Sequence, residues 1–136
     1  CLTPEARLWK EMRTGLKATS REIQPTRIET AAAPGVPDVM LCDERGRIHL
    51  IELKCTGANA VRLSPHQVSF MIRHEHASVW IAVKRDGAKK GKTLFLFSGS
   101  DAIAVAERGI AGAEPHGVLD YPVIWNDFFQ LVAPIA

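Results

Sequence analysis

The sequence predicts an α/β domain built around one mixed β-sheet. Apolar residues at helical spacing alternate along the chain with short apolar runs of strand length. The resulting order is helix, three strands, helix, two strands and helix, which is typical of a sheet covered by helices. At 136 residues the chain is expected to form one domain, residues 1–136, that buries about two-thirds of its unfolded surface.

The first predicted helix begins at the sequence TPE (3–5), which places Thr at the cap, Pro at the first helical position and an acid in the first turn. Apolar residues then follow at helical spacing: Leu8, Trp9, Met12 and Leu16. Gly15 is the predicted end of this helix. A short strand is predicted within TRIETA (26–31), and APGVP (33–37) is predicted to turn.

Two strands are predicted at 37–43 and 47–55, joined by a hairpin turn in which Gly46 can adopt positive φ. The sequence SPHQ (64–67) is a strong helix start. The runs SVWIAVK (78–84) and TLFLFS (93–98) predict strands around a basic turn. A helix capped by Ser100 and ended by Gly109 is predicted, although the alternation of this segment also permits a strand. The tail is loop-rich until VIWNDFFQLV, which is apolar enough for either core or an interface.

Composition excludes several classes of protein. No apolar run approaches the roughly 20 residues that a membrane span needs, and charges from Glu5 onward leave no signal-peptide core, so we expect a cytoplasmic protein of a bacterial or phage-infected cell and no membrane partner. Three cysteines without CxxC spacing disfavour a disulfide scaffold or a cysteine zinc site. Residues 1–92 contain 16 Lys/Arg and 10 Asp/Glu, whereas residues 93–136 contain 1 Lys/Arg and 5 Asp/Glu. The excess of positive charge in residues 1–92 suits a surface that binds a polyanion.

The hairpin contains charges where its pattern predicts core. If residues 44–46 form the loop, the residue numbers of each opposed pair add up to 90, so Asp38 faces Glu52. Because side chains alternate between the faces of a strand, Asp38, Glu52 and Lys54 emerge on one face. Two carboxylates placed opposite each other repel, and removing them from water makes this worse. Lys54 or a divalent cation can supply the missing positive charge, and an oxygen-only donor set favours Mg²⁺ or Mn²⁺ over zinc.

A purely structural reading of these residues stays open. Charged clusters at strand ends are common, and an Asp–Lys or Glu–Lys bridge beside a turn needs no chemistry. Titration with Mg²⁺ or Mn²⁺ separates the two readings, because only a metal site loses its affinity in both Asp38→Ala and Glu52→Ala.

The linked set GVPD (35–38), IELK (51–54) and LSPHQ (63–67) resembles the PD-(D/E)xK nuclease superfamily. The stand-alone VRR-NUC domains and the Holliday-junction resolvase-like members are the most similar. The resemblance covers residues 35 to about 84, with weaker agreement in the first helix and in RIET (27–30). It implies a restriction-endonuclease-like core, in which a central mixed β-sheet is flanked by helices in the order α-β-β-β-α-β.

The resemblance also implies a metal-dependent deoxyribonuclease. On this analogy Asp38, Glu52 and the backbone carbonyl of Leu53 are metal ligands, and Lys54 positions water and steadies charge on the phosphate. Gln67 matches a glutamine that contacts water or phosphate in such nucleases, although Ser64-x-x-Gln67 is equally a capping box. Glu5 shares the buried face of the first helix and is a further catalytic candidate, or simply an acid that stabilises a helix N-terminus. Glu29 is a weaker candidate.

DNA contacts are expected from the basic turn between the last two predicted strands, which otherwise is a solvated charge run; its basic residues are Lys84, Arg85, Lys89, Lys90 and Lys92. Arg62, Arg27 and Arg73 are further candidates for DNA contact, but their spacing in the sequence does not indicate a shared surface. A four-way junction has two symmetric scissile strands, so a resolvase is expected to be a homodimer acting on branched DNA. The alternatives are a nickase or end-processing nuclease on other DNA structures, a non-catalytic DNA-binding module on the same fold, and a metal-free structural subunit.

Overall fold

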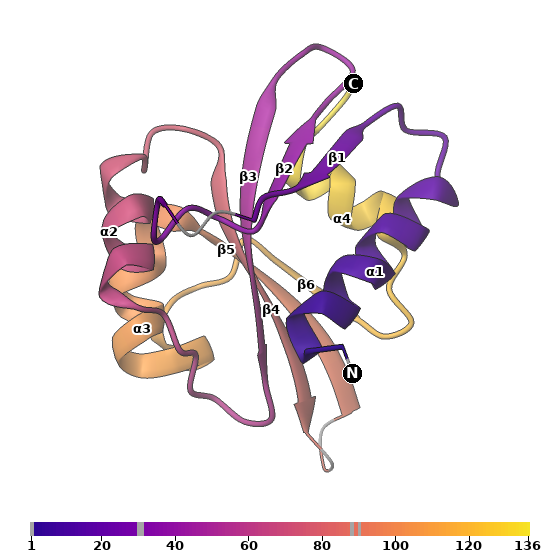
Figure 1. Ribbon diagram of the computed structural model, residues 1–136. Coiled ribbons are helices and arrows are strands. Elements are labelled where there is room, and N and C mark those ends of the chain that lie inside the picture. The colour runs from indigo at the N-terminus through magenta and orange to yellow at the C-terminus, as the bar shows by residue number, and fades with distance from the viewer. Residues whose placement is uncertain (1, 30–31, 88, 90) are drawn as a thin grey trace.

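The computed structural model describes residues 2–29, 32–87, 89 and 91–136. Within these residues six strands form one sheet in the spatial order β1 to β6, with helices on both faces (Figure 1). All neighbouring strands are antiparallel except β3 and β4, which are parallel and joined through α2. The elements are α1 (Pro4–Lys17), β1 (Gln24–Arg27), β2 (Val39–Cys42), β3 (Ile48–Thr56), α2 (Pro65–Arg73), β4 (Val79–Gly87), β5 (Gly91–Ser98), the 3-10 turn η1 (Gly99–Asp101), α3 (Ala102–Arg108), the 3-10 turn η2 (Gly109–Gly112), β6 (Gly117–Asp120) and α4 (Trp125–Val132).

The predicted α/β class is confirmed, as is the order helix, three strands, helix, strand from α1 to β4. The predicted strand within 26–31 is displaced, since β1 runs from Gln24 to Arg27, and Thr30 and Ala31 lie outside the described residues. The tail contains a strand that the sequence did not predict. β6 extends the sheet by pairing with β5, and its short, half-exposed pattern gave little apolar signal.

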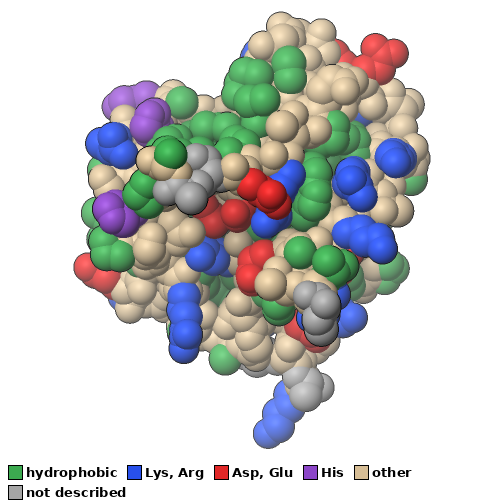
Figure 2. All heavy atoms as spheres, in the orientation of Figure 1, with side chains coloured by type: hydrophobic (Ala, Val, Ile, Leu, Met, Phe, Trp, Pro, Cys, Tyr) green, Lys and Arg blue, Asp and Glu red, His purple; other side chains and the backbone are tan. Residues whose placement is uncertain are grey.

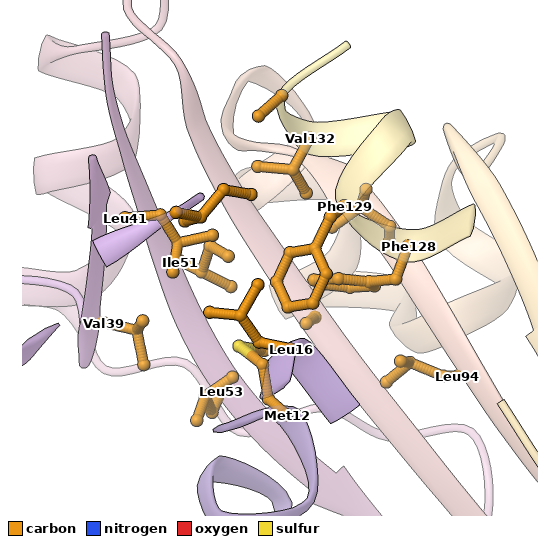
Figure 3. Packing of buried hydrophobic residues seen from close by; sticks show 14 of the residues in the cluster. Met12, Leu16, Val39, Leu41, Ile51, Leu53, Leu94, Phe128, Phe129 and Val132 are labelled. Carbon is orange, nitrogen blue, oxygen red and sulfur yellow. The ribbon is translucent and has the colours of Figure 1, made fainter. Parts of the chain in front are cut away.

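Two apolar cores lie on opposite faces of the sheet. On one face, α1 and α4 cover the residues of β2 and β3 that point toward them (Figure 3). Leu8 and Met12 from α1 and Phe128 and Phe129 from α4 are fully buried there. The segment VIWNDFFQLV therefore contributes to the core of this chain. On the other face, α2 and α3 cover β4 and β5.

The sequence predicted that α1 ends at Gly15, but the helix continues to Lys17. Gly15 is buried, and a β-carbon there would overlap the indole ring of Trp125 at the start of α4. The missing side chain thus allows α4 to pack directly against α1. Close helix contact, rather than helix termination, explains this glycine.

The β2–β3 turn is fixed by a network centred on Asp43. Its Oδ1 accepts the backbone amides of Arg45 and Arg47 at 2.9 and 3.0 Å, and its Oδ2 lies 2.8 Å from His49 Nε2. His49 Nδ1 in turn lies 2.6 Å from Ser78 Oγ at the start of β4. Burial raises the pKa of Asp43, but the hydrogen bonds from His49 and the two amides outweigh it and lower the pKa to about 2. This turn sets the pairing register of β2 with β3.

Arg21 ties three distant segments together near the chain end. Its side chain is almost fully buried and forms a two-pronged ion pair with Glu44, at 2.7 and 3.0 Å, while Nη2 donates to the carbonyl of Ala133 at 2.6 Å. The hydrogen bonds from Arg21 lower the pKa of Glu44 to about 2. No helix within the described residues is long and apolar enough to cross a membrane.

Candidate active site

The observed register of the hairpin is the one predicted from its turn. Met40 pairs with Leu50 and Cys42 pairs with Ile48, so the residue numbers of each pair add up to 90. Asp38 directly precedes β2, and its carbonyl accepts the amide of Ile28 at 2.7 Å, which continues the pairing of β1 with β2. The same register extended by one step places Asp38 opposite Glu52. Both side chains line the same cavity, as this register requires.

Asp38, Glu52 and Lys54 line one cavity of about 580 Å³, hereafter the site cavity. It lies where β1, β2 and β3 meet the N-termini of α1 and α2. Its charged and amide-bearing lining residues are Glu5, Arg27, Asp38, Glu52, Lys54, Arg62 and Gln67. Figure 2 shows acidic and basic side chains side by side in the middle of the same face of the molecule, between α1 and α2.

Glu52 is the most constrained group in the site cavity. The residue is only 2% exposed, and its Oε1 is buried without a hydrogen-bond partner in the described part of the chain. Burial first, followed by the hydrogen bond and the negative charge of Asp38, raises the pKa of Glu52 to about 9; Lys54 and Arg27 pull it down but do not compensate. Burial and Asp38 therefore favour the protonated form of this carboxyl group.

Asp38 and Lys54 complete the central cluster. Asp38 Oδ2 accepts the backbone amide of Leu53 at 2.9 Å, which fixes the carboxylate against β3. Within the described residues Lys54 forms no hydrogen bond or ion pair, and its side chain is half-buried. A lysine held in this way remains available for an anionic ligand that enters the cavity.

Gln67 forms the capping box that the sequence left open and also contacts Glu52, while its contact with water or phosphate stays a prediction. Its Oε1 accepts the amide of Ser64 at 2.9 Å while Ser64 Oγ accepts the amide of Gln67 at 3.1 Å, which completes the capping box of α2. Its Nε2 donates to Glu52 Oε2 at 3.3 Å. One side chain thus caps the helix and orients a site carboxyl group.

Gly35 brings the two halves of the motif together. It adopts φ of 89°, and a β-carbon there would overlap the backbone carbonyl of His66 in the first turn of α2. The glycine of GVPD (35–38) therefore permits the loop before β2 to lie against the N-terminus of α2. This contact places Gln67 beside the carboxylates of the hairpin.

Glu5 also lines the site cavity, at the N-terminus of α1. The Thr3 cap and Pro4 start the helix there, and Thr3 Oγ1 accepts the amide of Ala6 at 3.1 Å. Burial, and after it the Glu5 carboxylate, raises the pKa of the neighbouring Cys55 thiol to about 12. Glu29, by contrast, is exposed two residues beyond β1 and is not in the cavity lining.

Arg27 is a site residue that sequence reasoning did not assign to the centre. It lines the site cavity from β1, and its Nη1 is buried and has no hydrogen-bond partner among the residues that the structure describes. Arg27 pairs with Val39 in the register, so it stands next to Asp38. Only the pairing of β1 with β2 places it there, and the polar segment before β2 gave no signal of that pairing.

The predicted DNA-contact residues are dispersed. Arg62 is exposed at the rim of the site cavity. Lys84 forms an ion pair with Glu11 at 2.6 Å, and Arg85 lies over the ring of Phe95. Lys89 is exposed in the β4–β5 turn, Lys92 is exposed near that turn opposite Asp86, and Lys90 lies outside the described residues.

The donor chemistry of the site cavity suits a hard divalent cation. Its carboxyl donors are oxygens, and Oε1 of Glu52 is a buried acceptor without a hydrogen-bond partner among the described residues. Among the described residues no three His, Cys, Asp or Glu side chains gather closely enough to hold a metal on their own. A cation here would be held by Asp38, Glu52 and a backbone carbonyl.

Comparison with known proteins gives one structural likeness. No protein-family model matches the chain, and no curated protein matches it. A solved structure described as "VRR_NUC domain" superimposes with a TM-score of 0.49 and 21% sequence identity, and the match covers 78% of this chain and 97% of that one.

Proposed function

We propose that this chain is a divalent-metal-dependent nuclease that hydrolyses phosphodiester bonds in DNA. The observation that carries the proposal is the buried Glu52 carboxyl group, held against Asp38 and beside Lys54 in the site cavity. Burying two acids together destabilises a fold unless a positive charge compensates. Hydrolysis of an anionic ester is accelerated by a bound cation that activates water and by positive side chains placed where negative charge develops.

The residues fit Mg²⁺ or Mn²⁺. Asp38 and Glu52 would hold the ion together with the backbone carbonyl of Leu53. When bound, such an ion polarises the phosphodiester and makes water acidic enough to attack near neutral pH. In the overall reaction the oxygen of water adds to phosphorus and one ester bond breaks, which yields a phosphate monoester and an alcohol.

The chain's own side chains supply positioning and positive charge. Lys54 is expected to hold the attacking water or a phosphate oxygen rather than act as a simple base. Arg27 Nη1 is a buried donor that finds no partner within the described residues, and it is suited to a second phosphate oxygen. Gln67 orients Glu52 through its Nε2. Glu5 closes the α1 side of the site cavity, where it is expected to act on a water molecule.

We further propose a structure-specific enzyme of the Holliday-junction resolvase type, acting as a homodimer. Two symmetric scissile strands require two active sites related by a two-fold axis. The competing activities are nicking or end-processing of other DNA structures by the same cavity, and DNA binding without cleavage. The intact Asp38, Glu52 and Lys54 favour catalysis over a degenerate module.

The decisive experiment offers four-way junction, flap, nicked and linear DNA to the protein with Mg²⁺, Mn²⁺ or EDTA. Asp38→Asn tests the site cavity, and Asp120→Asn, an exposed acid on β6, is the matched control. We expect cleavage with metal that Asp38→Asn loses and Asp120→Asn keeps. Paired symmetric cuts at the junction would support the resolvase, whereas cuts confined to flaps or nicks would support the end-processing enzyme.

Calorimetric titration with Mn²⁺ tests the metal separately from the substrate. The affinity should disappear in both Asp38→Ala and Glu52→Ala. Binding that persists in either variant, or DNA binding without cleavage in every metal, would refute the catalytic proposal.

A further inference from the structure

The exposed face of α1 carries a row of basic side chains that the sequence analysis did not single out. Arg7, Lys10, Arg13 and Lys17, hereafter the basic stripe, are all exposed and recur every three or four residues. At a rise of about 1.5 Å per residue, the stripe is roughly 15 Å long. Figure 2 shows Lys and Arg side chains gathered over α1 on the same face of the molecule as the site cavity.

The charge of the basic stripe is not neutralised from within the chain. None of its four members forms an ion pair with an acid among the described residues. The acid that helical spacing brings next to Arg7 is Glu11, and both its oxygens are occupied elsewhere. Oε1 accepts from Lys84 at 2.6 Å and Oε2 from the Tyr121 hydroxyl at 2.8 Å. Like charges three or four residues apart destabilise a helix. A bound polyanion would offset this repulsion within the basic stripe.

The basic stripe begins at the rim of the site cavity. Glu5, two residues before Arg7, lines that cavity. Arg7 lines a small neighbouring hollow with Cys55, and Cys55 also lines the site cavity. A polyanion lying along α1 would therefore lead directly to the carboxylates.

The chemistry of this face favours nucleic acid over a membrane. An amphipathic helix binds a lipid surface by burying its apolar face in it. The apolar face of α1 is already committed to the core, with Leu8 and Met12 at 0% exposure and Leu16 at 5%. Only charge is left to offer to a partner.

The same face favours a duplex over a single strand. Surfaces for single strands combine positive charge with aromatic rings on which bases stack. The aromatic residue of α1, Trp9, is half-buried, and the guanidinium of Arg13 lies 5.9 Å above its ring. A rigid row of charges without a stacking platform instead matches the backbone of a stacked strand, whose phosphates advance about 3.4 Å each, so about four or five of them lie along the stripe.

We propose that the basic stripe of α1 binds the sugar-phosphate backbone of the double-stranded DNA arm that flanks the scissile bond. This inference rests on the proposed nuclease function and extends it, because it requires a substrate with a duplex arm on the α1 side of the site cavity. Lys92, one of the residues predicted to contact DNA, lines a hollow together with Arg7 and Lys10 and extends the stripe toward β5. Lys84 is held by Glu11 and takes no part.

The test compares two triple variants of equal net charge. The stripe variant is Lys10→Gln, Arg13→Gln and Lys17→Gln, in which glutamine keeps the helix propensity. Arg7 is left intact because its side chain donates to the carbonyl of Leu2 at 3.2 Å and lies nearest the cavity. The control variant removes three exposed arginines away from α1: Arg45→Gln, Arg47→Gln and Arg73→Gln. Circular dichroism and thermal unfolding confirm that each variant is folded.

Binding is measured without cleavage, by fluorescence anisotropy on a labelled 20-bp duplex in EDTA over a range of salt concentrations. Each phosphate contact contributes about 0.9 to the slope of log K against log salt. The stripe variant should therefore lose about 2.7 units of slope, which corresponds to up to about 500-fold in affinity at 0.1 M salt. The control variant should keep the slope of the unmodified protein.

Four outcomes would overturn the inference: an unchanged slope in the stripe variant, equal losses in the two variants, a loss seen with a single strand but not with the duplex, or a loss confined to anionic vesicles. The binding assay also separates this inference from the proposed function. Stripe-dependent duplex binding without cleavage in any metal would refute the nuclease alone. Cleavage with an unaffected stripe variant would refute the basic stripe alone.

Discussion

The buried carboxyl group of Glu52 gives the metal-free protein a specific dependence of stability on pH. Its pKa rises from 4.5 to about 9 on folding, because burial and Asp38 disfavour the charged form. A group with a raised pKa in the folded state contributes stability that is fully present below the unfolded pKa and is lost as the pH rises toward the folded one. The loss amounts to roughly 1.36 kcal/mol per pH unit, or about 2.7 kcal/mol between pH 5 and pH 7.

Replacement of Glu52 by glutamine removes this dependence while it keeps the size of the side chain. We expect the free energy of unfolding of Glu52→Gln to gain about 2.7 kcal/mol relative to the unmodified protein as the pH is raised from 5 to 7. The measurement is urea denaturation followed by tryptophan fluorescence, in EDTA, at closely spaced pH values. Asp43 and Glu44, with pKa values of about 2, are ionised throughout this window and do not interfere.

The matched control is Glu114→Gln, which neutralises an exposed acid outside the site cavity. Its stability curve should run parallel to that of the unmodified protein. Parallel curves for Glu52→Gln as well would show that Glu52 is ionised in the folded protein, and would refute the conclusion that burial and Asp38 outweigh the positive charges of Lys54 and Arg27.

Three further predictions concern the turn, the helix contact and the capping residue. Asp43→Asn should lower the free energy of unfolding by about 2 kcal/mol at pH 7, because the pKa of Asp43 falls from 3.8 to about 2 on folding. This contribution to stability is present above pH 3.8 and is lost as the pH falls toward 2. A loss of stability in urea denaturation that stays the same at low pH would contradict the prediction. Gly15→Ala should lower the free energy of unfolding by about 1–3 kcal/mol through overlap with Trp125, whereas a gain of about 1 kcal/mol in thermal unfolding would mean that the position is an ordinary free helix site. Gln67→Glu retains the capping acceptor but loses the donor to Glu52, so thermal unfolding should change little while metal-dependent DNA cleavage falls; full cleavage activity would remove Gln67 from the site.

Much of the central hairpin could be predicted from the sequence because its geometry is local. Side chains alternate strictly along a strand, and a three-residue loop leaves one register, so the spacing from Asp38 to Glu52 was enough to oppose them. The capping box of α2 follows from Ser64 and Gln67 in the same way, since its hydrogen bonds span one helical turn.

Other parts of the site depend on contacts between segments far apart in the chain. Arg27 enters the site cavity because β1 pairs with β2, and Glu5 enters because the core residues of α1 dock on the sheet. A polar β1 and a helix of ordinary amphipathic pattern carry no local sign of where they dock. The role of Gly15 was mistaken for the same reason, since the ring that it accommodates is more than a hundred residues away.

The sequence by itself determined the α/β class, the hairpin register and the meeting of Asp38 with Glu52, because hydrogen bonds between near neighbours allow few alternatives. Only the tertiary structure decided which basic residues are free. Burial of the apolar face of α1 turns its arginines and lysines outward in a row, and packing of Tyr121 and Lys84 onto Glu11 removes the acid that would have neutralised them. Packing over long sequence distances sets those positions, and no spacing rule within one segment contains that information.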